Sequence, residues 1–290
     1  MSPHRKEPVL RRLVPYLLLL AVKAVARIFW RFESRWVGEV PAGDRWKGIR
    51  LVVFLNHTSL YEWVFAGLPP ARFLAKLARH GVVPVAQKTI ERRFVGAFYG
   101  LVAAHVVPLS RQRDESWQSL LAKVDDPKAM VIILPEGKMM RRNGLDGEGR
   151  PMSLRGGVTD LLLAIPEGRL LFAYSGGLHH VQAPGESLPR LFRTVRMDFE
   201  VVDLAAYRDG FLAEAGRAGF RDAVVDDMEQ RLLSCSPVHP GTAPIPLWPY
   251  GPSRTRRAAK ARASRTGEPA AAGAPAPPDS PGSHPTPSSG

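Results

Sequence analysis

The sequence predicts an α/β protein with a mostly parallel sheet flanked by helices. Between about residue 50 and residue 235, short β-branched apolar runs alternate with longer segments of helical period. An apolar, basic stretch comes before this region, and a stretch rich in Pro, Ala and Ser follows it. We therefore expect a helical segment at 1–36, an α/β domain at 37–240 and a disordered tail at 241–290.

The N-terminal segment, VLRRLVPYLLLLAVKAVARIFWRF, is apolar but interrupted by basic residues. Its uncharged run from Leu13 to Val22 is far shorter than the ~20 residues that span a bilayer. Lys23, Arg27 and Arg31 recur every four residues and would share one helical face, reaching toward lipid headgroups. This pattern predicts a membrane-interfacial helix, with a core helix, a signal peptide or a true span as alternatives.

The elements of the central region follow from periodicity and turn residues. The predicted strands are 50–55, 71–74, 105–109, 129–134 and 170–174, with a half-exposed strand at 194–202. The predicted helices are 59–67, 91–102, 114–124, 154–165 and a last one on which Phe220, Val224, Met228 and Leu232 share a face. Because ligands bind beyond the carboxyl ends of parallel strands, the residues that follow strands 50–55 and 129–134 are candidates for a site.

Charge and cysteine content exclude several classes of protein. The formal net charge is +13, of which residues 1–36 carry +6 and residues 251–290 carry +4. Basic ends do not predict a nucleic-acid footprint on the folded domain, and they suit an anionic membrane surface at least as well. A single cysteine, Cys235, excludes an internal disulfide framework and a multi-cysteine zinc site.

The stretch LNHTSLYEW places Asn56 and His57 directly after the predicted strand 50–55, with Glu62 five positions beyond His57. A neutral imidazole can take a proton from a hydroxyl when a carboxylate orients it, and Glu62 is the candidate carboxylate. The letters from Ser59 to Glu62 also match the S-x-x-E capping box, in which the glutamate binds a backbone amide at a helix start. Both interpretations start a helix near Ser59, and the pattern leaves them open.

This stretch resembles the N-H-x4-D motif of the glycerolipid acyltransferase family, of the lysophosphatidic acid acyltransferase type. The resemblance implies that His57 is the general base and that Glu62 stands in the place of the usual aspartate. The extra methylene moves the carboxylate by about 1 Å, a shift that matters for positioning. The resemblance also implies direct attack of the acceptor hydroxyl on an acyl thioester, without a covalent enzyme intermediate.

A second block, ILPEGKMMRR at 133–142, resembles the family's F-P-E-G-T-R block, which binds the phosphoglycerol part of the acceptor. The letters P-E-G match in order and include Glu136 and Gly137. Lys138 and Met139 replace the usual threonine and arginine. Composition alone would also fit a strand ending in a Pro-Gly turn with a solvated basic run.

Positive charge for an anionic headgroup would come from Lys138, Arg141 or Arg142. A third block, VGAFYGLVAAHVVPLSRQ at 95–112, resembles the family block whose arginine contacts the acceptor phosphate, and Arg111 is the matching position. The family's fourth block would fall at RLLFAYSGG, but its proline is absent and no residue is carried over. The His179-His180 pair that follows is interpreted as a loop pair, because adjacent side chains on an extended chain point apart.

The sequence therefore predicts an acyltransferase at the cytoplasmic face of a membrane. It would move an acyl group from acyl-CoA or acyl carrier protein to a lysophospholipid such as lysophosphatidate, and no metal, bound cofactor or nucleic acid is expected. The expected catalytic residues are His57 and Glu62, and the expected substrate-binding residues are Asn56, Arg111, Glu136, Gly137, Lys138 and Arg141. The alternatives are an acyltransferase of the same fold for a non-phosphate lysolipid and a non-catalytic basic lipid-binding protein.

Overall fold

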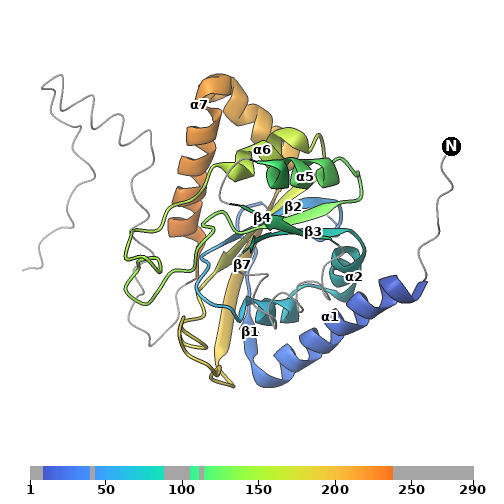
Figure 1. Ribbon diagram of the computed structural model, residues 1–290, viewed down its shortest axis with the longest axis vertical. Coiled ribbons are helices and arrows are strands. Elements are labelled where there is room, and N and C mark those ends of the chain that lie inside the picture. The colour runs from blue at the N-terminus through green and yellow to red at the C-terminus, as the bar shows by residue number, and fades with distance from the viewer. Residues whose placement is uncertain (1–8, 40–42, 88–104, 111–113, 238–290) are drawn as a thin grey trace, which may run out of the picture. The chain divides into compact units, whose positions relative to one another are not determined.

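The computed structural model describes residues 9–39, 43–87, 105–110 and 114–237 of the chain (Figure 1). All of them lie in one compact unit, Met1–Ser253. The predicted helix 91–102, the predicted tail 241–290 and Arg111 fall outside the described residues.

Within the described residues, seven strands form one sheet in the order β1-β7-β6-β2-β5-β3-β4. The strands are β1 (Arg31–Glu33), β2 (Ile49–Leu55), β3 (Gly81–Ala86), β4 (His105–Leu109), β5 (Met130–Ile133), β6 (Arg169–Ser175) and β7 (Thr194–Asp203). Every strand pair in this part of the chain is parallel except β6 with β7, which confirms the mostly parallel sheet.

Helices cover both faces of the sheet (Figure 1). They are α1 (Val9–Phe29), the 3₁₀ helix η1 (Glu62–Gly67), α2 (Ala71–His80), α5 (Glu115–Val124), α6 (Gly157–Ala164) and α7 (Leu204–Cys235). Side chains of β2 alternate between two cores, because successive residues of a strand point to opposite faces. Leu51, Val53 and Leu55 face α5, α6 and α7, whereas Val52 and Phe54 face α1, η1 and α2.

Several predicted elements are confirmed with shifted ends. Strands 50–55, 105–109, 129–134, 170–174 and 194–202 correspond to β2, β4, β5, β6 and β7. Helix 114–124 is α5, with the Asp114 carboxylate capping it through the Ser116 amide. The predicted apolar face of the last helix is buried, since Phe220, Val224, Met228 and Leu232 are each at most 2% exposed.

The predicted strand 71–74 is wrong, because these residues begin α2. Pro70 directly precedes the helix and has an extended conformation. The buried Phe73, Leu74 and Ala78 follow a helical period that a window of four residues is too short to reveal. The helix leads into β3, a strand that the sequence analysis missed.

Pro84 obscured β3, because proline argues against an interior strand. The structure accommodates it through uneven pairing. β3 pairs with β5 only at Gly81 and Val82, so the rest of the strand has β4 as its paired neighbour among the described strands.

The N-terminal segment forms a helix as predicted, but its charges lie elsewhere than expected. Lys23 Nζ donates to the carbonyl oxygens of Gly67 and Pro69 at 2.9 and 2.6 Å, and Arg27 Nε donates to Gly67 at 2.9 Å. Arg31 belongs to β1 rather than to the helix. The expectation that these three side chains share one lipid-facing side is therefore wrong. Among the helices of the described residues, none is long and apolar enough to cross a bilayer.

Candidate functional site

Three loops meet at one edge of the sheet because β6, β2 and β5 are parallel neighbours. They follow Leu55, Ile133 and Ser175, the last residues of these strands. The carboxyl edge of a parallel sheet is where ligands usually bind. This edge brings the histidine stretch and the P-E-G block together, as predicted, and adds a third loop.

Asn56 turns the chain sharply at the end of β2. Its φ is 72°, in the left-handed region that asparagine tolerates better than most residues. Its backbone amide donates to Glu136 Oε1 at 2.7 Å, and its Nδ2 donates to the Ser175 carbonyl at 2.8 Å. Asn56 is 1% exposed, so it connects the three loops from inside.

His57 and Glu62 form a hydrogen-bonded pair. His57 Nδ1 lies 2.5 Å from Glu62 Oε2, and the two side chains are 19% and 13% exposed. Because a carboxylate accepts, this contact assigns the proton to Nδ1 and leaves Nε2 as the acceptor in the neutral ring. Within the described residues no hydrogen bond engages Nε2.

The carboxylate of Glu62 contacts both His57 and backbone amides of its own turn, the two roles that the sequence left open. Its second oxygen, Oε1, accepts from the Thr58 amide at 2.9 Å and from the Ser59 amide at 3.4 Å. The Ser59 hydroxyl accepts from the Tyr61 amide at 3.1 Å rather than from the amide of residue 62. The helical turns of η1 begin at Glu62, and their N-cap residue, Tyr61, makes no side-chain cap bond, so only the contact of Glu62 with the Ser59 amide remains of the predicted capping box.

Two carboxylates shape the protonation of His57. Burial disfavours the imidazolium, but the adjacent Glu62 and the more distant Glu136 outweigh it and raise the pKa of His57 above its ordinary value. Burial also raises the pKa of Glu136 to about 7. Glu136 is 2% exposed and holds Asn56, so the structure gives it a supporting position behind the histidine.

The P-E-G block continues into a segment rich in charged side chains, residues 137–151, which we term the hairpin. Gly137 has a φ of 61° and lies so close to Arg155 that a Cβ would meet its Nε at 3.0 Å. Lys138 Nζ is 2.6 Å from Asp146 and 3.4 Å from Glu148. The lysine is therefore largely occupied by carboxylates.

A cavity of about 230 Å³ lies beside this hairpin. Glu136, Lys138, Asp146, Arg150 and Arg155 contribute charged side chains to its wall. Lys138 and Arg150 both lie near the buried Asp146, at 2.6 and 3.6 Å. Arg155 is exposed and has no ion pair within the described part of the chain. The sequence analysis did not single out Arg155, because no motif contains it.

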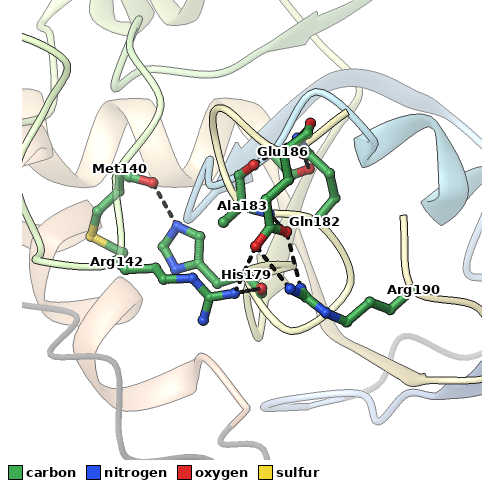
Figure 2. Close-up of polar contacts among 8 residues, drawn as sticks. Met140, Arg142, His179, Gln182, Ala183, Glu186 and Arg190 are labelled. Atoms are coloured by element: carbon green, nitrogen blue, oxygen red, sulfur yellow. Dashed lines mark hydrogen bonds and ion pairs between the residues drawn. The ribbon is translucent and has the colours of Figure 1, made fainter. Parts of the chain in front are cut away.

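Arg141 is exposed, and its backbone amide donates to the Leu145 carbonyl at 2.8 Å within the same hairpin. Arg142 turns away from the cavity, because its guanidinium donates to the His179 carbonyl at 2.7 Å (Figure 2). The expected substrate contacts stay predictions for Asn56, Arg111, Glu136, Gly137, Lys138 and Arg141.

The third loop, which begins at Ser175, carries the histidine pair that the sequence analysis interpreted as an ordinary loop. His179 is fully buried, and its Nε2 donates to the Met140 carbonyl at 2.7 Å. Its Nδ1 has no hydrogen-bond partner among the described residues. Burial lowers the pKa of His179, so the ring is neutral near pH 7. The Ser-Gly-Gly sequence was the available signal, since Gly177 has a φ of 80° and packs against Asn56 and Thr58.

Comparisons with known proteins were made by family, by sequence and by structure. No protein-family model matches the chain, and no curated protein matches it. The 1-acyl-sn-glycerophosphate (LPA) acyltransferase PlsC from Thermotoga maritima is similar in structure, with a TM-score of 0.45 and 15% sequence identity. The similarity covers 77% of this chain and 84% of that chain.

Proposed function

We propose that this protein is an O-acyltransferase that moves an acyl group from an acyl thioester to the hydroxyl of a lysolipid. The observation that carries the proposal is the His57–Glu62 pair, with its 2.5 Å contact at Nδ1 and a partly exposed ring. A base and an orienting acid in hydrogen-bond contact at the carboxyl edge of a parallel sheet suit proton abstraction from a hydroxyl.

The chemistry requires a single histidine base. His57 Nε2 takes the proton from the acceptor hydroxyl while its oxygen attacks the thioester carbonyl carbon. Glu62 stabilises the imidazolium that forms, because its carboxylate already binds Nδ1. The tetrahedral intermediate then expels the thiolate, which takes the proton from His57. The products are the acylated lipid and the free thiol of coenzyme A or of acyl carrier protein.

We place the acceptor headgroup in the cavity beside the hairpin. A volume of about 230 Å³ can hold a phosphoglycerol group, and Glu136 in its wall lies behind Asn56 and His57. Arg155 lines the cavity and has no ion pair among the described residues. We assign to it the anion contact that the family's arginine makes, since Met139 stands at that arginine's position. This arrangement supports an anionic acceptor such as lysophosphatidate.

We place the membrane against the outer face of α1. Leu13, Val14, Leu17, Val25 and Ile28 on this helix are 41–67% exposed. Leu188, Leu191 and Phe192 are 42–80% exposed on the loop beside its end, where the Phe192 amide donates to the Phe29 carbonyl at 2.6 Å. Apolar side chains gathered this way suit insertion into the lipid interface, with the exposed Arg31 and Arg193 near anionic headgroups. The face would be cytoplasmic, where acyl-CoA and acyl carrier protein are found.

The first test is acyl transfer by detergent-solubilised protein from a long-chain acyl-CoA to lysophosphatidate. His57→Ala should abolish turnover, and Glu62→Gln should lower it by about 10²-fold or more while retaining the cap. A panel of neutral lysolipids and an acyl-carrier-protein donor belong in the same experiment. Absence of turnover with every pair would contradict the proposal and favour a non-catalytic lipid-binding protein.

A second acceptor class follows from one observation. Lys138 is held by Asp146 and Glu148, and its neighbour Met139 is apolar, so this block offers an anion less charge than its sequence suggests. A non-phosphate lysolipid is therefore the alternative acceptor. If this alternative holds, anionic and neutral lysolipids should be acylated equally fast, and substitution of Arg155 should leave turnover unchanged.

A further inference from the structure

Residues 56–61, which we term the histidine turn, are hydrogen-bonded along their length to residues 175–187. We term this second segment, which runs from the last residue of β6 into the following loop, the clamp loop. Four side chains of the turn take part in these bonds. They are Asn56 Nδ2 to Ser175 O at 2.8 Å, Leu178 N to Thr58 Oγ1 at 2.8 Å, Ser59 Oγ to Gln182 Oε1 at 2.5 Å and Tyr61 Oη to Ser187 O at 3.2 Å. The clamp loop therefore contacts both sides of His57.

His57 itself is held through one intermediate residue. The Met140 amide donates to the His57 carbonyl at 2.8 Å, and the Met140 carbonyl accepts from His179 Nε2 at 2.7 Å. Figure 2 shows the contact between Met140 and His179. The backbone of the histidine is thus connected to the clamp loop through the backbone N–H and C=O of Met140.

Gln182 is a buried side chain of the clamp loop whose amide is hydrogen-bonded through both its oxygen and its nitrogen. It is 2% exposed, and its Nε2 donates to the carbonyl oxygens of Ala183 and Glu186, both at 2.7 Å. These two bonds fix the amide so that Oε1 faces the Ser59 hydroxyl. Ser59 in turn accepts from the Tyr61 amide, the residue directly before Glu62.

Ion pairs hold the clamp loop in this shape (Figure 2). Glu186 accepts from the Ala183 amide at 2.9 Å and from Arg190 at 2.8 and 3.0 Å. Arg142 donates to the His179 carbonyl at 2.7 Å, so the hairpin block is attached as well. A loop anchored at this many points can impose its geometry on the shorter histidine turn.

We propose that Gln182 is a positioning residue that sets the contact between His57 and Glu62 through Ser59. The inference rests on the proposed function for its effect on turnover, but not for its effect on the pair. The hydrogen bond between Ser59 and Gln182 is buried, so removing one partner leaves the other without a hydrogen bond and costs free energy. This bond lies in the turn that brings the Glu62 carboxylate to the His57 imidazole. Without it the Ser59 turn relaxes, Glu62 keeps its cap with Thr58, and the Nδ1 to Oε2 contact lengthens.

The test compares Gln182→Met with the full-length wild type by NMR and kinetics. Methionine keeps the length of the side chain and removes both polar groups. The Nδ1 proton of His57, at low field because of its short bond to a carboxylate, should move upfield or broaden. The pKa of His57 in the ¹³C-labelled ring should fall toward the ordinary histidine value, because Glu62 then stabilises the imidazolium less. Turnover should fall by about 10- to 100-fold in kcat with little change in KM.

Two further variants separate positioning from general destabilisation. Ser59→Ala removes the other end of the same bond by a smaller change and should shift His57 in the same direction, even if Gln182→Met folds poorly. Tyr207→Phe removes one partly buried side-chain bond, at 2.6 Å to Asp227, between two residues of α7. It should lower Tm without moving the His57 signals.

The outcomes distinguish this inference from the proposed function. Unchanged His57 signals in both Gln182→Met and Ser59→Ala would overturn the positioning role whatever the activity. Shifted signals in a protein that transfers no acyl group would support the positioning role and contradict acyl transfer. A rise in KM with unchanged kcat and unchanged signals would also overturn the inference, because it would assign Gln182 to substrate binding.

Discussion

The backbone amide of Asn56 and the carboxylate of Glu136 are joined by a 2.7 Å hydrogen bond, although the residues lie 80 positions apart in the chain. Both are almost fully buried. The bond attaches the end of β2 to the end of β5 directly behind His57. Glu136 therefore acts on the histidine turn through the backbone of Asn56. Burial raises the pKa of Glu136 to about 7.

Glu136→Gln should make stability less dependent on pH. Between pH 4.5, the ordinary pKa, and about 7 the folded protein retains a proton on Glu136 that the unfolded chain releases. Stability from this group is therefore lost as pH rises through that window, at roughly 1 kcal/mol per pH unit. Glutamine still accepts from Asn56 but cannot ionise.

Urea unfolding of both proteins at pH 5, 6, 7 and 8 measures this difference. The stability of Glu136→Gln relative to wild type should rise up to about pH 7 and then level off. A constant difference across the series would show that Glu136 titrates alike in the folded and unfolded states.

The pH profile of acyl transfer should report the Glu62 contact. Activity requires neutral His57, whose pKa is raised, so the acidic limb of kcat/KM should lie above the pH of an ordinary histidine. Glu62→Gln removes the charge that raises this pKa, and the limb should move to lower pH while the plateau falls. A limb at the same pH in both proteins would assign it to another group.

Glu62→Asp should impair catalysis, although aspartate is the usual residue of the motif. The glutamate spans from the Thr58 amide at 2.9 Å to His57 Nδ1 at 2.5 Å, and a side chain shorter by about 1 Å cannot reach both with this backbone. We expect a loss of about 10-fold or more in kcat. Glu39→Asp, which shortens an exposed glutamate away from the pair, is the control. Full activity of Glu62→Asp would show that the turn adapts.

Arg155→Gln should weaken the acceptor selectively. Its guanidinium lines the cavity without an ion pair in the described residues, so a bound anion should gain most from it. KM for lysophosphatidate should rise about 10-fold or more, with kcat and KM for the acyl donor unchanged. Arg208, whose guanidinium contacts the adjacent Asp209 at 2.8 Å on α7, is the matched position. An unchanged KM in Arg155→Gln would place the headgroup elsewhere.

Arg231→Met should destabilise the fold without touching the site. The arginine binds Glu200 at 2.6 Å and Asp227 at 2.7 Å, and Tyr174 and Tyr207 donate to the same two carboxylates. Its removal leaves two half-buried carboxylates without a cation, at a cost of about 3 kcal/mol. Tm should fall clearly while kcat of the folded protein is retained. An unchanged Tm would show that solvent replaces the arginine.

Single acidic substitutions should identify the membrane face. Ile28→Asp and Phe192→Asp each place a charge on the proposed face, where the wild-type side chains are 67% and 64% exposed. Binding to liposomes that contain anionic lipid should fall about 10-fold in sedimentation. Leu233→Asp, at an apolar position 43% exposed on α7, is the control and should bind as wild type does. Equal loss in all three variants would reflect net charge alone.

The sequence predicted the sheet and the central pair because their signals are local. Residues 50–55 and 129–134 are apolar runs of strand length, and parallel order brings their carboxyl ends together. Asn56, His57 and Glu62 lie within seven residues, so their contact needs only one turn of chain. From the sequence, Glu62 could either orient His57 or bind backbone amides. In the structure it does both, because one carboxylate oxygen contacts the imidazole and the other accepts from an amide.

What the sequence could not predict depends on contacts between distant segments. Arg155 reaches the cavity from the loop before α6, and Gln182 reaches Ser59 across 123 positions. The spacing of Lys23 and Arg27 on α1, four positions apart, predicted that they face the lipid. The backbone carbonyl of Gly67 at the end of η1 provides a nearer partner, and only the packed structure shows it.

The attachment of α1 to η1 has a mechanical consequence. Lys23 and Arg27 bind the carbonyl of Gly67 at the last residue of η1, and Glu62 is the first residue of the same short helix. The segment that would rest on the bilayer and the carboxylate that orients His57 are therefore linked by less than two turns of 3₁₀ helix. If α1 adsorbs to a lipid surface as proposed, a tilt or shift of α1 would be transmitted along this short helix to Glu62 and from there to the imidazole.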